Sequence, residues 1–160
     1  GPSPVLFLPY LTGARTPHND PHAKGVLFGL TPATKREDLA QAMLEGVAFA
    51  LADCQTYLAE TSPLPESIGV IGGGSKSRFW MRLLATILDR RVILYEGADV
   101  GPAFGAARLA RLADTGEKPE AVCNKPKEVA EIAHDSGLQQ AYFKRLKTFQ
   151  SLYRALRPLF

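Results

Sequence analysis

The sequence predicts an α/β domain in which a mixed sheet is flanked by helices. Strand-like apolar runs alternate along the chain with segments of helical period, and neither a long linker nor an internal repeat separates them. In the middle of the chain, an apolar run leads through three consecutive glycines into an amphipathic segment, as in a strand–turn–helix unit. With 160 residues, of which 46% are hydrophobic, the chain is long enough for one domain with a core. We therefore treat residues 1–160 as a single domain.

The first two strands are expected on either side of a long loop. Residues 5–10 form a short apolar run, and residues 25–30 form a second one that ends at a Thr-Pro pair. Between them, Pro17 and Pro21 exclude regular structure from residues 11–24.

A long helix is predicted after the second strand. Thr34 and Glu37 have the spacing of a capping box, which predicts a helix start at Thr34, and the helix is expected to end near Glu60, before a Ser-Pro pair. Small and apolar residues recur at intervals of three and four along it, so one stripe is expected to face the core. The stripe consists of Leu39, Met43, Gly46, Val47, Ala50, Leu51, Cys54 and Leu58.

Residues 67–79, SIGVIGGGSKSRF, carry the most informative motif of the chain. Glycines allow backbone N–H groups to approach an anion closely. The start of the following helix presents free N–H groups and the positive end of the helix dipole to the same place. This arrangement predicts a site that binds phosphate.

The motif matches neither of the two best-known phosphate loops. The P-loop needs a glycine directly before Lys76 and another five residues earlier, and both are absent. The dinucleotide-binding fingerprint fits two of its three glycines but meets Ser77 at the third position. That fold requires an acid about 20 residues downstream, and Glu96 lies in this region, so a dinucleotide-binding domain of an oxidoreductase remains an alternative. A strand-to-helix turn that binds no ligand is a second alternative.

A strand–helix–strand unit is expected around the glycine motif. Helical period runs over residues 79–88, and the run RVILY at residues 91–95 is typical of a strand, which predicts a parallel pair. Asp99 is predicted to cap a helix over residues 102–113, whose small residues indicate a buried helix close to its neighbours. Gly116 is placed to end that helix.

The C-terminal part predicts one more strand and one more helix. Residues 128–132 are expected to form an edge strand and residues 138–156 a terminal helix. The basic residues of this helix are interpreted as a solvated face. Its inward face is expected to contain Tyr142, Leu146, Phe149, Tyr153 and Leu156.

Charge, cysteine content and hydropathy exclude several classes of protein. A net charge of +3, from 19 basic and 16 acidic side chains, is too balanced for a nucleic-acid-binding protein. No apolar run approaches the ~18 residues that a membrane span needs, and no secretory leader is apparent. Cys54 and Cys123 are too few for a disulfide framework. These observations favour a cytoplasmic protein that binds neither nucleic acid nor membrane.

Several segments together resemble the FGGY family of carbohydrate kinases. The segment GVLFGLTPATKREDLAQAMLE, at residues 25–45, looks like the second signature of that family. Upstream, FLPYLTGARTPHNDPHAKG, at residues 7–25, resembles the loop of the branch that phosphorylates xylulose. Downstream, VIGGGSKSRFW at residues 70–80 and DVGPAFGAARLA at residues 99–110 resemble the two adenosine-site elements of the family in matching order. The likeness extends over residues 6–113.

The resemblance implies the C-terminal, nucleotide-binding part of a two-domain sugar kinase with the actin-like ATPase (ribonuclease H-like) fold. It implies transfer of phosphate from ATP, with Mg²⁺, to D-xylulose, giving D-xylulose 5-phosphate. Kinases for glycerol, ribulose or gluconate are the alternatives. Gly73 and Ser77 occupy positions at which relatives contact ADP, and Gly72, Gly74 and Ser75 form the flanking turn.

Residues beside this turn could serve either the nucleotide or the fold. Gly101, Pro102 and Gly105 either bring the helix at residues 102–113 close to the nucleotide or allow close helix packing. Lys76 is expected to be solvated or to offer its charge to a phosphate.

The loop segment His18-Asn19-Asp20-Pro21-His22 places two imidazoles beside a carboxylate in the sequence. We do not interpret it as a metal site, because a spacing of four brings two histidines together only in a helix, which the prolines disfavour. Asp20 is expected to close a local Asx turn or, with Arg15, to contact the substrate side or a neighbouring domain.

No residue of this chain is predicted to be catalytic or to bind a metal. A sugar kinase needs a base, usually a carboxylate, beside the attacking hydroxyl. The resemblance implies that this base is an Asp and that it lies, with most of the sugar site, in an N-terminal domain that residues 1–160 do not include. We therefore expect the chain alone to bind nucleotide weakly and to transfer no phosphate. The full-length protein is expected to be a homodimer. A non-catalytic interaction module with an exposed apolar face is a further alternative.

Overall fold

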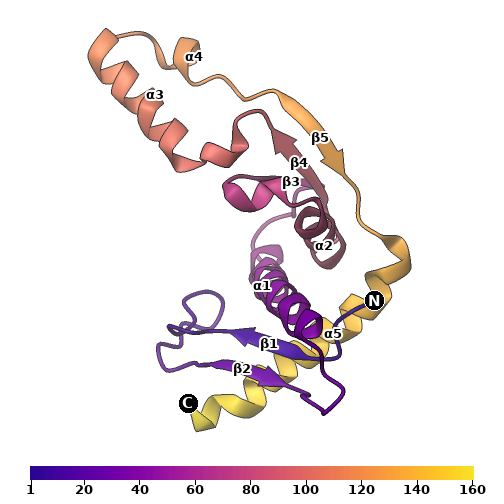
Figure 1. Ribbon diagram of the computed structural model, residues 1–160. Coiled ribbons are helices and arrows are strands. Elements are labelled where there is room, and N and C mark those ends of the chain that lie inside the picture. The colour runs from indigo at the N-terminus through magenta and orange to yellow at the C-terminus, as the bar shows by residue number, and fades with distance from the viewer.

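The computed structural model describes residues 1–160, and its N-terminal part is a hairpin packed on a long helix. β1 (Leu6–Pro9) pairs antiparallel with β2 (Gly25–Phe28), and both lie beside α1 (Arg36–Ala59) in Figure 1. Alternate residues of β1, Leu6 and Leu8, are buried, as the period of a half-buried strand requires.

The start of α1 lies one residue beyond the predicted cap. Lys35 is the N-cap, and its N–H donates to Asp38 Oδ2 at 2.8 Å. Thr34 instead accepts a hydrogen bond from the Thr31 N–H at 2.9 Å, and so closes the turn that precedes the helix. The predicted capping box of Thr34 and Glu37 is therefore wrong by one residue.

The predicted inward stripe of α1 is largely wrong. Gly46 is buried as expected. It lies so close to β1 that a Cβ at this position would collide with the carbonyl oxygen of Phe7. The helix buries mainly small residues where its neighbours approach closely, and the larger members of the stripe lie on its open side. The exposed members are Met43, Val47, Leu51 and Leu58, and the buried residues of the helix are Ala42, Glu45, Gly46, Ala48, Phe49, Ala52 and Asp53.

A mixed sheet forms the second layer. β3 (Ser67–Val70) and β4 (Arg91–Tyr95) are parallel and are connected by α2 (Arg78–Leu88). β5 (Glu128–Ile132) adds to β4 in the antiparallel direction, which gives the order β3-β4-β5. The predicted parallel pair, the edge strand and the mixed sheet flanked by helices are confirmed.

The helix after β4 projects from the sheet. α3 (Pro102–Thr115) and α4 (Pro119–Val122) extend away from the other helices in Figure 1. The predicted helix and its end at Gly116, which has a left-handed φ of 66°, are confirmed. Its predicted burial is wrong, since no residue of α3 is buried. Small side chains allow another element to pack closely on a helix, but they do not determine whether an element lies there.

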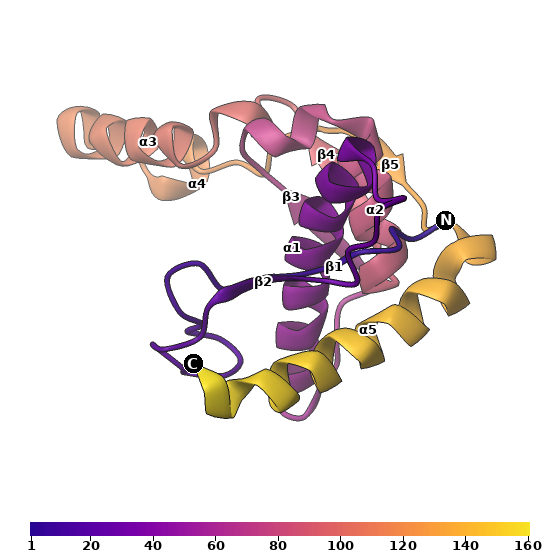
Figure 2. The same ribbon diagram turned by 60° about the horizontal axis from the view of Figure 1, so that its bottom comes forward.

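The C-terminal helix closes one side of the molecule. α5 (Ser136–Leu156) crosses α1 in Figure 2 and is followed by a short 3-10 turn, η3 (Arg157–Leu159). Its predicted inward residues Tyr142, Phe149 and Tyr153 are buried, and one hydrophobic cluster joins β1, α1, α2, β4 and α5. None of the helices combines the length and hydrophobicity that crossing a membrane requires.

Candidate functional site

Two glycine-containing turns lie side by side at one edge of the mixed sheet. η1 (Gly73–Lys76) follows β3, and η2 (Ala98–Val100) follows the adjacent parallel strand β4. Ligands of open α/β sheets bind beyond the carboxyl ends of parallel strands. The fold therefore places the predicted glycine motif where such a site is expected, together with a second turn that the family resemblance links to it.

The close approach of the two turns depends on glycine. Gly72 has φ 93° and ψ 174°, a conformation that only glycine adopts readily, and its N–H donates to the carbonyl oxygen of Ala98 at 2.6 Å. Gly101 has φ 50° and ψ −130°, and a Cβ there would lie 3.6 Å from the Gly72 Cα. Side chains at either position would strain the backbone.

The two serines of the motif shape the turn. The Ser75 hydroxyl is mostly buried and donates to the carbonyl oxygen of Gly72 at 2.8 Å. The Ser77 hydroxyl accepts from the Trp80 N–H at 3.2 Å and so caps α2. These local roles account for both hydroxyls, and a contact between Ser77 and a nucleotide stays a prediction.

The turn offers unpaired backbone donors. The N–H groups of Gly73 and Gly74 form no hydrogen bond within the chain, and neither do those of Arg78 and Phe79 at the start of α2. Both glycines are exposed, and no atom lies within 4 Å of the position that a Gly73 Cβ would take. Free donors beside an open space at a helix N-terminus are chemically suited to an anion such as a phosphate.

An ion pair joins the two turns on their solvent side. Lys76 Nζ lies 2.8 Å from Asp99 Oδ2, and this hydrogen bond holds the pKa of the Asp99 carboxyl below its usual range. The predicted cap role of Asp99 is wrong, because α3 begins after Gly101, which separates Asp99 from the helix start. Lys76 is exposed, as expected of a solvated lysine, but it is also paired.

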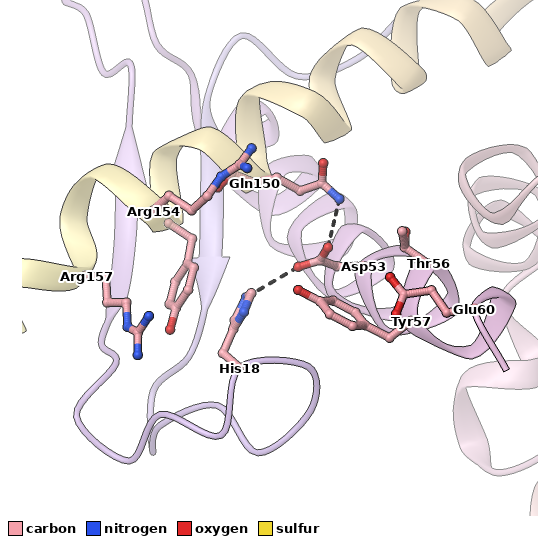
Figure 3. A pocket seen from close by; sticks show the side chains of 9 residues that line it. His18, Asp53, Thr56, Tyr57, Glu60, Gln150, Arg154 and Arg157 are labelled. Carbon is pink, nitrogen blue, oxygen red and sulfur yellow. Dashed lines mark hydrogen bonds and ion pairs between the residues drawn. The ribbon is translucent and has the colours of Figure 1, made fainter.

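A polar pocket of about 420 Å³ lies elsewhere, between the long loop, α1 and α5. Figure 3 shows Asp53 between His18 and Gln150, with His18 Nε2 3.3 Å from Asp53 Oδ2 and Gln150 Nε2 donating to Asp53 Oδ1 at 2.8 Å. Burial lowers the pKa of His18, and the nearby Asp53 carboxylate opposes that shift. The same Nε2 atom of His18 also lies within hydrogen-bond distance of the Tyr10 hydroxyl, at 3.2 Å. The aromatic ring of Tyr153 stacks on His18 with 3.6 Å between ring centroids.

The loop of His18 is held by local bonds. Asp20 Oδ1 accepts from the N–H groups of His22 and Ala23 at 3.0 and 3.2 Å, which confirms the predicted Asx turn. Its other oxygen accepts from the Tyr153 hydroxyl at 2.8 Å. Asp20 therefore fixes the loop on α5.

The part of the chain that matches known proteins includes both glycine turns. The sequence model described as "FGGY family of carbohydrate kinases, C-terminal domain" matches residues 1–113. The chain belongs to the FGGY family of carbohydrate kinases. The xylulose kinase of Escherichia coli (strain K12) is 46% identical to this FGGY chain over 158 residues, which are 98% of the chain and 32% of that relative.

Other FGGY proteins agree in sequence and in fold. The crystal structure of a "xyloylose kinase" from Brucella ovis superposes on this chain with a TM-score of 0.86 at 41% identity, over 99% of this chain and 33% of that one. An apulose kinase of Pectobacterium atrosepticum is 33% identical over 96% of this chain and 32% of its own length. The chain thus spans about a third of the length of these FGGY relatives.

These findings confirm the family resemblance and the actin-like ATPase fold. They overturn the oxidoreductase alternative, for which Glu96 was to bind a ribose. In the structure, the Glu96 side chain is exposed and its backbone N–H donates to the Lys127 carbonyl oxygen at 2.9 Å.

Proposed function

We propose that this chain forms the adenine-nucleotide site of an ATP-dependent xylulose kinase that converts D-xylulose to D-xylulose 5-phosphate. One observation carries the proposal: two glycine turns meet at the carboxyl ends of β3 and β4, in a chain 46% identical over 98% of its length to a xylulose kinase. FGGY carbohydrate kinases use ATP as the phosphate donor.

The turns would bind and orient the nucleotide. In this proposal, the free N–H groups of Gly73 and Gly74 donate to phosphate oxygens, and Gly72, Ser75 and Ser77 keep the turn in shape. Positioning and charge stabilisation provide most of the catalysis of phosphoryl transfer. The base that takes the proton from the sugar is proposed to lie in another part of the full-length protein.

Mg²⁺ is proposed to be bound mainly by the nucleotide. No three His, Cys, Asp or Glu side chains of this chain converge on a metal site. Magnesium is commonly held by one or two carboxylates together with the phosphates of the substrate. The residues present therefore do not form a cage for the ion, and the chain's own contribution is to hold the nucleotide.

The sugar assignment is the finer part of the proposal. D-xylulose is preferred because the E. coli xylulose kinase is 46% identical to the chain, whereas the apulose kinase is 33% identical over a similar length. The full-length protein should give its highest kcat/KM with D-xylulose, among D-xylulose, ribulose, glycerol, gluconate and apulose. A higher kcat/KM for another sugar would contradict the assignment of D-xylulose as the substrate and would not affect the proposed nucleotide site.

Substitution of Gly73 tests the nucleotide site. Because nothing lies within 4 Å of its Cβ position, Gly73→Val should keep the fold and place methyl groups where a phosphate would bind. We expect ADP with Mg²⁺, titrated by calorimetry or NMR, to bind at least about tenfold more weakly, which corresponds to roughly 1.4 kcal/mol. Ala133→Val, at an exposed position between β5 and α5, is the matched control and should change nothing. Unchanged ADP affinity in a folded Gly73→Val chain would overturn the proposal.

The remaining parts of the full-length protein are proposed as partners. The exposed stripe of α1 supports contact with a preceding domain, since large exposed apolar patches mark interaction surfaces. Both cysteines are free thiols, which suits a reducing cytoplasm. We also propose a homodimer for the full-length protein, and light scattering of that protein would contradict it by giving the mass of a monomer.

A further inference from the structure

We propose that Lys76 and Asp99 are positioning residues that clamp the two glycine turns into one cradle for the phosphates of an adenine nucleotide. The proposal rests on the proposed function, because it names the residues that set the geometry of that same site. Neither residue is placed in direct contact with the nucleotide.

Two polar contacts join the two turns. One is the hydrogen bond from the Gly72 N–H to the Ala98 carbonyl oxygen at 2.6 Å, and the other is the ion pair of Lys76 Nζ and Asp99 Oδ2 at 2.8 Å. The hydrogen bond lies at the start of η1, and the ion pair lies at its end. Together they attach both ends of the turn that carries the free N–H groups of Gly73 and Gly74.

The energetics of the pair indicate a role in local geometry. The side chains of Lys76 and Asp99 are 69% and 38% exposed, and such ion pairs contribute little to global stability. Two turns that are joined by only two polar contacts are nevertheless held less firmly when one of these contacts is lost. Preorganised donors bind an anion more tightly than donors that must first be ordered.

Charge gives the pair a second effect on phosphate binding. Asp99 without Lys76 would be an unpaired carboxylate beside the phosphate chain, and like charges repel. Lys76 without Asp99 would be free to reach a phosphate as a point charge. A clamp and a direct phosphate ligand therefore predict opposite results for Asp99→Asn, which would weaken binding in the first case and strengthen or preserve it in the second.

The experiment compares two single variants with a charge exchange. We expect Lys76→Met and Asp99→Asn each to weaken binding of ADP with Mg²⁺ by about threefold to fivefold, the upper part of the range of an exposed ion pair. The double variant Lys76→Asp/Asp99→Lys should restore the affinity to within about twofold of wild type, because it re-forms the pair. Exchange of the Gly72 amide hydrogen, followed by NMR without nucleotide, should be faster in both single variants and slow again in the double variant.

The chain offers a matched control pair. Arg111 Nη2 lies 2.7 Å from Glu117 Oε2, and this exposed pair joins α3 to the segment before α4, away from the glycine turns. Arg111→Met and Glu117→Gln should leave both ADP affinity and Gly72 exchange unchanged.

Three results would count against the clamp, and they are distinguishable. Unchanged ADP affinity in both single variants would overturn it, as would tighter binding by Asp99→Asn or failure of the charge exchange to restore binding. A wild-type chain that binds no ADP would overturn the proposed function and the cradle with it, whereas Gly72 exchange would still report whether the pair joins the turns.

Discussion

Glu45 is a carboxylate in the core of the protein, only 1% exposed. It accepts hydrogen bonds from the Ser3 N–H at 2.9 Å, from Gln41 Nε2 at 2.7 Å and from the Tyr142 hydroxyl at 3.1 Å. Arg145 Nη2 donates to the Ser3 carbonyl oxygen at 2.6 Å and completes the network. One buried side chain thus attaches the N-terminal segment to α1 and α5, as a buried charge requires several partners.

Removal of this carboxylate should destabilise the fold strongly. Glu45→Ala would leave the Ser3 N–H and the Tyr142 hydroxyl buried without acceptors, at an expected cost on the order of 3 kcal/mol. Glu45→Gln keeps one oxygen as an acceptor and should cost less. Urea unfolding of the three proteins measures the difference, and equal midpoints for Glu45→Ala and wild type would contradict the network.

Residues of this kind could not be predicted from the sequence. Glycine turns and helix periods are local patterns, so the sequence predicts the turn at Gly72–Gly74. The partners of Glu45 on α5 and the pairing of Lys76 with Asp99 join distant segments, and no local pattern encodes them. The only available signal for Lys76 was its place inside the glycine motif, which did not reveal its partner.

Among the elements, α2 combines two possible roles for one residue. Ser77 caps the helix through the Trp80 N–H, and it also occupies a position at which the family resemblance implies contact with ADP. A change that preserves the cap and alters the charge can separate these roles, because aspartate is as good an N-cap as serine.

We therefore predict different results for two substitutions of Ser77. Ser77→Ala should lower the free energy of unfolding by about 1 kcal/mol through loss of the cap. Ser77→Asp should retain stability but weaken ADP binding by about tenfold or more, since its carboxylate would repel a phosphate at the helix start. Chemical unfolding and ADP titration provide the two measurements.

The N-cap of α5 supplies the control. Asp135 Oδ1 accepts from the Gly137 N–H at 3.0 Å, so Asp135→Ala should cost a similar free energy without any change in ADP affinity. If Ser77→Asp bound ADP as tightly as wild type, a phosphate beside the start of α2 would be excluded.

The helices also show where sequence periodicity was insufficient. The extents of α3 and α5 were predicted closely, because Gly116 and the aromatic period of the last helix are strong local signals. Burial of α3 and the inward stripe of α1 were wrong. Periodicity identifies a surface able to pack, but the surrounding chain determines whether anything packs there.

At the scale of the whole molecule, the order of strands and helices followed from the sequence, whereas the arrangement of the sheets did not. The parallel pair of β3 and β4 is a consequence of the strand–helix–strand pattern. The hairpin of β1 and β2 forms a separate sheet that contacts the rest mainly through α1 and α5. That arrangement depends on long-range contacts, such as the 5.6 Å between the ring centroids of Phe49 and Phe149.

The chain by itself is expected to transfer no phosphate. Asp99, which joins the two glycine turns, is bound to Lys76 and its pKa is lowered, so it is a poor base for a sugar hydroxyl. The chain also covers only 32% of the E. coli xylulose kinase, and we expect the base in the remainder. With ATP, Mg²⁺ and D-xylulose, ADP formation by residues 1–160 should equal that of a reaction without sugar, while the full-length protein turns over. Sugar-dependent ADP formation within about tenfold of the full-length rate, a difference of roughly 1.4 kcal/mol in barrier, would show that a competent base lies within this chain.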